Sequence, residues 1–166
     1  QPPRDRRRGR HDPASPAGHG VRVVRPVTNL LLEDCRLDFF STNLTLTAGD
    51  APGATLTNVR VRRCQVLDAW STAGAFSGQG LYASGCDGLL IEDNVFERNW
   101  AQAQSGYAIL FTVRNQDGGC PWCAIENVQF QRNTIRDVAA AFQILGTDYL
   151  KPSRRTKNVV IRDNTI

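Results

Sequence analysis

Apolar and polar residues recur along this chain in a nine-residue pattern that appears five times. Each copy begins with Asn or Gly, has apolar residues at its second, fourth and ninth positions, and has polar residues at its fifth and sixth positions. The five copies, called repeats below, are Asn29–Leu37, Asn58–Val66, Gly88–Phe96, Asn127–Ile135 and Asn158–Ile166. Their first residues lie 29, 30, 39 and 31 residues apart. Self-similarity at such a period indicates structural units that stack on one another as a solenoid.

The spacing of the apolar residues within a repeat predicts β-structure. The second and fourth positions follow the two-residue period of a strand with one buried face. The ninth position is out of phase with them, which requires a turn that restarts the alternation. Each repeat is therefore predicted to contain a short strand, a corner and another short strand, and the expected fold class is all-β.

The seventh position of each repeat falls at the predicted corner. Asn tolerates the left-handed backbone conformation, and its amide both donates and accepts hydrogen bonds. Equivalent Asn side chains in successive repeats are therefore predicted to bond to one another and to the corner backbone, forming an asparagine ladder. The residues at this position are Cys35, Cys64, Asn94, Asn133 and Asn164.

Charges at the fifth and sixth positions support stacking in register. Equivalent residues on neighbouring parallel strands lie about 4.8 Å apart, so like charges there repel and alternating signs attract. The sixth-position residues alternate in sign along the chain, and the fifth-position residues nearly do so. We interpret both columns as a charged, solvated face without catalytic chemistry. The columns are Asp34, Arg63, Asp93, Arg132 and Asp163, and Glu33, Arg62, Glu92, Gln131 and Arg162.

The recurring Asn-Val-x-Ile-x-x-Asn-x-Ile pattern, with hydrophobic segments Gly80–Ala83, Gly106–Phe111 and Ala141–Gly146 between copies, resembles the pectate-lyase-like superfamily. The resemblance implies a single-stranded right-handed parallel β-helix solenoid of about five rungs over residues 21–166. It also implies a secreted or cell-surface location. That superfamily includes polysaccharide lyases, glycoside hydrolases, uronan epimerases, phage tailspikes and binding modules, so it does not fix the function. No cofactor is evident from the residues, and Ca²⁺ is suggested by the resemblance only.

Composition adds a basic N-terminal segment and few further constraints. Residues 1–20 are rich in Pro, Gly and Arg, contribute much of the formal net charge of +4, and are predicted to be a disordered leader or linker. Nucleic-acid binding is disfavoured because no aromatic platform accompanies these cations. The apolar runs are too short to cross a bilayer. The absence of Met and an end at Ile166 inside a repeat suggest a fragment truncated at its C-terminal end.

Five cysteines fall into two groups and one single residue. Cys35 and Cys64 share the corner position and are predicted to be unbridged, buried thiols, because the strand spacing slightly exceeds the usual disulfide range. Cys120 and Cys123 form a Cys-Pro-Trp-Cys motif in the longest spacer, where a local disulfide or a packed loop is favoured over a metal site or redox chemistry. Cys86 stands alone.

Two polar loops are predicted to lie side by side and to form a binding groove. They are Thr112–Ala124 and Thr147–Lys157, each of which follows a predicted strand. Trp and Tyr rings suit sugar faces, and Arg and Lys suit a uronate carboxylate. Loops that only connect strands remain the alternative. The groove candidates are Arg114, Asn115, Asp117, Trp122, Asp148, Tyr149, Lys151, Arg154 and Arg155.

The predicted function is binding or processing of an acidic polysaccharide. Hydrolysis requires two carboxyl groups, and Asp117 with Asp148 is the one loop pair that suits it. Lyase or epimerase chemistry requires a cation and a base, which the loop residues supply better. Strand alternation predicts that Tyr82, Ala108 and Gln143 point outward, and these include no carboxylate. Whether the chain is an enzyme, and through which catalytic residues, stays open. The alternative is a non-catalytic module such as a surface adhesin or a tailspike-like shaft.

Overall fold

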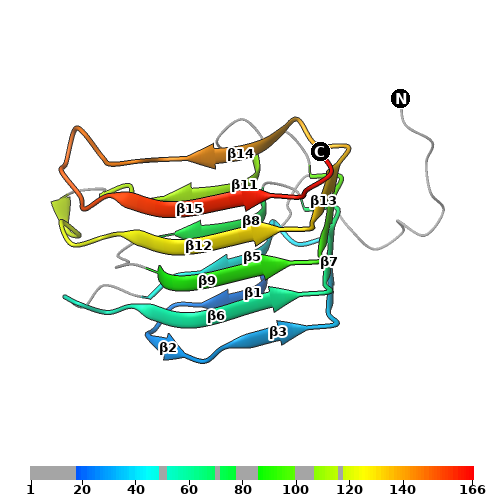
Figure 1. Cartoon of the computed structure of the whole chain (residues 1–166), viewed down its shortest axis with the longest axis horizontal. Coiled ribbons are helices and arrows are strands. Elements are labelled where there is room, and N and C mark those ends of the chain that lie inside the picture. Colours follow the sequence, from blue (N-terminus) through cyan, green and yellow to red (C-terminus); the bar gives the residue numbers. More distant parts are fainter. Residues whose placement is uncertain (1–17, 49–51, 70–71, 78–85, 100–106, 116–117) are drawn as a thin grey trace.

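The computed structural model describes residues 18–48, 52–69, 72–77, 86–99, 107–115 and 118–166. These residues form fifteen β-strands, and no α-helix occurs among them. The strands are arranged in three sheets, and all of the described strand pairs are parallel (Figure 1). The predicted all-β class is confirmed.

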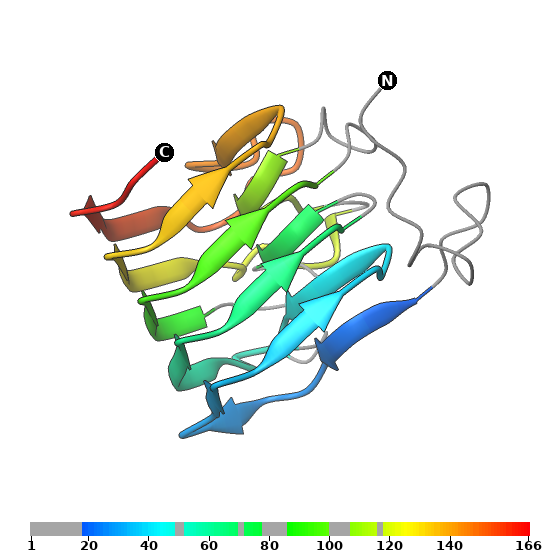
Figure 2. The same cartoon turned by 90° about the vertical axis from the view of Figure 1, so that its right-hand side faces the viewer.

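Each sheet contains strands from successive repeats or from the segments between them. The first sheet has the order β1 (His19–Val23), β5 (Thr42–Leu46), β8 (Thr72–Ser77), β11 (Tyr107–Thr112) and β14 (Ala140–Ile144). The second has the order β13 (Thr134–Arg136), β10 (Val95–Glu97), β7 (Gln65–Leu67) and β4 (Arg36–Asp38). The third has the order β15 (Thr156–Arg162), β12 (Ile125–Gln131), β9 (Cys86–Glu92), β6 (Leu56–Arg62) and β2 (Val27–Thr28), and β3 (Leu31–Glu33) also pairs with β6. Figure 2 shows the strands one above another in chain order, from blue to red.

The pairing register agrees with the alignment of the five repeats. Val61 pairs with Ile91, Ile91 with Phe130, and Phe130 with Ile161, which are the fourth positions of successive repeats. Within the fourth repeat, the chain passes from β12 through a corner into β13. The predicted order of strand, corner and strand is therefore correct.

The left-handed backbone conformation lies one residue before the predicted position. All five sixth-position residues have positive φ, whereas none of the corner Asn residues does. The corner Asn is therefore selected for its amide group and not for its backbone conformation. A charged residue with positive φ is unfavourable by about 1–2 kcal/mol, so tertiary contacts must offset this cost. The φ angles are 54° at Asp34, 52° at Arg63, 58° at Asp93, 54° at Arg132 and 57° at Asp163.

The predicted bonds between asparagine side chains are present at the corner. Asn94 Nδ2 donates to Asn133 Oδ1 at 3.0 Å, and Asn133 Nδ2 donates to Asn164 Oδ1 at 3.2 Å. Each of these amides also donates to a carbonyl oxygen, as Asn133 Nδ2 does to Ile91 O at 3.0 Å. The side-chain oxygen of a corner Asn also accepts a backbone N–H from the corner of the preceding repeat. Asn94 Oδ1, for example, accepts the N–H of Cys64 at 2.8 Å. Buried backbone groups at the corner are thereby satisfied.

The charged columns form ion pairs between repeats. Asp34 Oδ1 lies 2.9 Å from Arg63 Nε, and Asp93 Oδ1 lies 2.9 Å from Arg132 Nε. Hydrogen bonds from these arginines hold the pKa of the Asp34 and Asp93 carboxyl groups below the ordinary value. These pairs bridge the residues with positive φ, so they stabilise the corner at the positions where its backbone is least favourable.

The apolar side chains of the repeats fill the space between the sheets. Fully buried residues include Val59, Leu89 and Val128 from the second position, and Ile91 and Phe130 from the fourth. The rings of Phe96 and Phe130 stack with centroids 5.8 Å apart. The core is therefore continuous from one repeat to the next.

Two expectations about this part of the molecule need correction. Strand β1 begins at His19, so ordered structure starts inside the segment 1–20 that was predicted to be a leader; residues 1–17 lie outside the described part of the chain. Cys64 is buried, but Cys35 is only partly buried, because no described strand covers the first repeat. Both thiols are unbridged, as predicted.

We expect Asn133→Leu to lower the free energy of unfolding by about 1–3 kcal/mol, because it leaves buried backbone groups at the corner without partners. Chemical denaturation followed by circular dichroism measures the change. Gln129→Leu, on the exposed face of the adjoining strand, is the matched control and should change stability little. Equal stability of the two variants would contradict a structural role for the corner amides.

We expect Cys35 to be alkylated before Cys64 and Cys86 in the native protein. Burial raises the pKa of the Cys64 thiol and raises that of Cys86 to about 12, so little thiolate forms at either residue at neutral pH. Timed labelling followed by peptide mass spectrometry gives the order. Early labelling of Cys86 would place that residue on the surface and contradict the fold.

Candidate functional site

The two polar loops do lie side by side, as predicted. Asn115 N donates to Asp148 Oδ2 at 2.9 Å, and Asn115 Nδ2 donates to the carbonyl oxygen of Pro152 at 3.0 Å. A third bond joins Arg154 N to the carbonyl oxygen of Pro121 at 3.1 Å. The candidate Asp117 lies outside the described residues.

Asp148 anchors the two loops to each other. Its side chain is 1% exposed, and its carboxylate accepts backbone N–H groups of Asn115, Leu150 and Lys151 at 2.9, 3.0 and 3.3 Å. Arg114 Nη1 lies 3.6 Å from Asp148 Oδ2. Burial alone would raise the pKa of this carboxyl group, but the three backbone donors and Arg114 together hold it below the ordinary value. A carboxylate held in this way is a structural acceptor.

A disulfide closes the first loop. Cys120 and Cys123 are bonded, with their Cα atoms 5.4 Å apart, which agrees with the favoured prediction for the Cys-Pro-Trp-Cys motif. Asn115 Oδ1 accepts the N–H of Cys120 at 2.6 Å, so Asn115 connects the disulfide to the second loop. Asn115 is buried and fixes the geometry of the two loops. The prediction that its side chain lines the groove is therefore wrong.

Part of the second loop presents an exposed cationic and aromatic surface. Tyr149 is 78% exposed, and the neighbouring Leu150 is 66% exposed. Lys151 and Arg155 are also exposed, and neither forms an ion pair with another described residue. We call Tyr149, Leu150, Lys151 and Arg155 the basic loop surface. Cations that have no acidic neighbour remain available to an anionic ligand.

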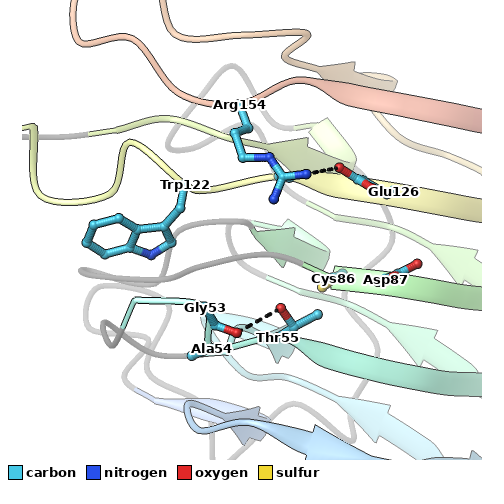
Figure 3. A pocket seen from close by; sticks show the side chains of 9 residues that line it. Gly53, Ala54, Thr55, Cys86, Asp87, Trp122, Glu126 and Arg154 are labelled. Carbon is cyan, nitrogen blue, oxygen red and sulfur yellow. Dashed lines mark hydrogen bonds and ion pairs between the residues drawn. The ribbon is translucent and has the colours of Figure 1, made fainter.

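Trp122 and Arg154 line a separate pocket of about 160 Å³ (Figure 3). Arg154 Nη2 lies 2.9 Å from Glu126 Oε1, and Lys157 Nζ lies 3.3 Å from Glu126 Oε2. Arg154 is thus paired with a carboxylate of the protein. The other lining residues are Gly53, Ala54, Thr55, Cys86, Asp87 and Ala124.

The walls of this pocket were not predicted from the sequence, although the alignment of the repeats contains the necessary signal. Cys86 and Asp87 directly precede the third repeat, and they pair with Ile125 and Glu126 directly before the fourth. Continuing the alignment two residues backward would have placed these side chains next to the loop that contains Trp122. The predicted residues thus divide between an anchored pair, Arg114 and Asp148, the basic loop surface and the pocket.

The prediction that Ala108 points outward from the first sheet is wrong. Ala108 is fully buried, and Gln143 pairs with Leu110, so the two residues are not equivalent in register as the alternation had assumed. Gln143 is half-buried, and Tyr82 lies outside the described residues. The observed register, with Tyr107 opposite Ala140, differs by two residues from the alignment of Gly106 with Ala141, and a shift of two residues leaves the alternation of faces unchanged.

Comparisons of the chain with family models, curated proteins and solved structures found no match. Among the described residues, no group of three or more His, Cys, Asp and Glu side chains could hold a metal ion. The same residues include no helix with the length and apolar character needed to span a bilayer. A function must therefore be argued from the chemistry of the loops.

We expect Asp148→Asn to destabilise the protein by about 1–3 kcal/mol near neutral pH, because an amide accepts the three backbone N–H groups less well than a carboxylate does. The pKa of the Asp148 carboxyl group is lower in the folded state than in the unfolded state. The ionised group therefore contributes its full stabilisation above the ordinary pKa near 4, and this stabilisation declines as the pH falls through the folded-state pKa.

The difference in stability between wild type and Asp148→Asn should therefore shrink as the pH is lowered below about 4. Denaturant unfolding at several pH values measures this difference. Asp163→Asn, at an exposed carboxylate, is the control and should have little effect at any pH. A difference that grows toward acid pH would contradict the anchoring role.

Proposed function

We propose that this chain is a right-handed parallel β-helix that binds an acidic polysaccharide through the basic loop surface. The observation that carries the proposal is that the second loop exposes the Tyr149 ring together with Lys151 and Arg155, two cations without an acidic partner in the described structure. A uronate polymer presents carboxylates to such cations and sugar faces to such a ring.

The order of the strands supports the proposed β-helix of about five rungs. In the fourth repeat the chain runs through β12 in the third sheet and β13 in the second, and then enters β14 in the first. It returns to the third sheet in β15, next to β12. The preceding passage runs from β9 through β10 and β11 and returns to the third sheet in β12, next to β9.

Binding is better supported than hydrolysis. Asp148, the one described member of the loop carboxylate pair, is occupied by backbone N–H groups and by Arg114. Its lowered pKa keeps the group ionised, whereas hydrolysis needs one protonated carboxyl group. We therefore propose a non-catalytic binding module. Uronan lyase or epimerase activity is the second candidate, and it rests on Tyr149 and Lys151, which are residue types that can act as a base.

A location outside the cytoplasm is part of the proposal. The Cys120–Cys123 disulfide supports it, because disulfides persist in oxidising compartments and are rare in the cytosol. The unbridged Cys64 and Cys86 do not oppose it, since both thiols are buried away from oxidants.

The test is a binding titration of polygalacturonate and of alginate, with a neutral polysaccharide for comparison. We expect Lys151→Ala combined with Arg155→Ala to weaken binding by about three- to tenfold, and added salt to weaken binding by the wild type. The control combines Arg36→Ala with Arg60→Ala, which removes the same charge from exposed positions on β4 and β6.

Three results would count against this function: no binding of either polyuronate, equal loss in the two double variants, or equal binding of the neutral polymer. Incubation with the same polymers separates binding from catalysis, since a lyase produces an unsaturated, ultraviolet-absorbing product. An epimerase leaves the absorbance unchanged and is detected by NMR of the polymer. Product formation in either assay would favour the enzyme over the binding module.

A further inference from the structure

Two cysteines take the place of asparagine in the corner ladder. The corner position holds Cys35 and Cys64 in the first two repeats and Asn in the other three. In the third repeat, Asn94 Oδ1 accepts the N–H of Cys64 at 2.8 Å, and Asn94 Nδ2 donates to the carbonyl oxygen of Val61 at 2.9 Å. A thiol is a weaker donor and a weaker acceptor than an amide. The first two corners thus have weaker ladder contacts and carry two sulfur atoms instead.

The two sulfur atoms belong to equivalent side chains on neighbouring strands. Gln65 N donates to the carbonyl oxygen of Cys35 at 2.8 Å, so the two corners are in register. Cys35 Sγ donates to the carbonyl oxygen of Glu33, two residues earlier, at 3.2 Å. Cys64 Sγ makes the same contact with the carbonyl oxygen of Arg62 at 3.3 Å. Both thiols therefore have the same orientation, and one lies above the other.

The spacing of this pair suits an ion held between two sulfurs. Equivalent positions on neighbouring parallel strands are about 4.8 Å apart. A disulfide requires sulfurs only about 2.0 Å apart, and Cys35 and Cys64 are unbridged. Two metal–thiolate bonds of about 2.3 Å, placed end to end, span about 4.6 Å. Burial and the neighbouring Cys35 thiol together raise the pKa of Cys64, which agrees with two sulfurs lying close together.

We propose that Cys35 and Cys64 bind one soft monovalent cation that prefers two ligands in a line, of the class of Cu⁺ and Ag⁺. Thiolates select soft ions of this kind. Binding forms two metal–sulfur bonds and releases two thiol protons to solvent, without a change of oxidation state. Zn²⁺ does not suit the pair, because it takes four ligands and no third His, Cys, Asp or Glu of the described chain completes a metal-binding group there. Cys35 is partly exposed, which gives the ion a route to the buried Cys64.

Ag⁺ is the probe, because it is stable in air and needs no reductant that would open the Cys120–Cys123 disulfide. Titration calorimetry in chloride-free buffer should show a tight phase of one ion per chain. X-ray absorption of the complex should show two sulfur neighbours and no nitrogen or oxygen neighbour. Bound Ag⁺ should also protect Cys35 from alkylation in the native protein. Zn²⁺ at the same concentration should give no such protection.

The variant Cys64→Asn removes one ligand and should keep the fold, because an amide at this position can repeat the contacts that Asn94 makes in the next repeat. Loss of a group that only supports a metal ligand costs about 10- to 100-fold in affinity, so loss of a ligand itself should weaken Ag⁺ binding by more than about 100-fold. Cys35→Ala should have the same effect. Cys86→Ala removes the other free thiol and is the matched control, which should retain wild-type affinity.

Circular dichroism and the unfolding midpoint of Cys64→Asn show that the variant is folded, so that lost binding reports the lost ligand. The proposal would be overturned if the wild type lacked the tight Ag⁺ phase, if Cys64→Asn kept it, or if Cys86→Ala lost as much affinity as the other variants. Nitrogen or oxygen neighbours of the bound ion would also overturn it. A Cys35–Cys64 disulfide in peptide maps of the native protein would do the same.

Discussion

The corner hydrogen bonds are the constraint on which the rest of this structure depends. Each time the chain turns between sheets, it carries backbone N–H and C=O groups into the buried interior, and these must find partners. Asn133 meets this need with three contacts, to the N–H of Asn94, the carbonyl of Ile91 and the amide of Asn94. These contacts form only when consecutive repeats are in register. The corner thus fixes the alignment that buries the apolar columns.

Much of the fold was predictable because its determinants are local and repeat. The apolar residues at the second and fourth positions of the repeats predicted the strands. The opposite charges at equivalent positions, such as Asp93 and Arg132, predicted that neighbouring strands pair in register. The position of the left-handed residue was not predictable in the same way. The sequence shows two adjacent polar positions, 93 and 94, either of which can adopt positive φ as Asp or Asn. Which of the two residues adopts positive φ depends on which side chain must point into the corner to hydrogen-bond its buried backbone groups.

The candidate site was less predictable because it is made by segments that do not repeat. Arg114, Asp148 and Arg154 have residue types that suit a groove for a sugar acid, and all three lie in the predicted loops. Whether such a residue serves a ligand depends on what faces it. Asp148 faces the backbone of the neighbouring loop and Arg154 faces Glu126, which are contacts between residues far apart in the sequence. Tyr149 and Lys151 remain exposed, and among the described residues no hydrogen bond or ion pair reaches their side chains.

The longest spacer shows that this architecture separates loop length from register. The interval between the third and fourth repeats is 39 residues, against 30 and 31 for the intervals on either side. Nevertheless β9, β12 and β15 pair position for position. Six of the eight residues by which this interval exceeds the following one lie between β10 and β11, and the loop from β11 to β12 that contains the Cys120–Cys123 disulfide is one residue longer than the loop from β14 to β15. Connections between strands can therefore vary in length while the strand framework stays constant.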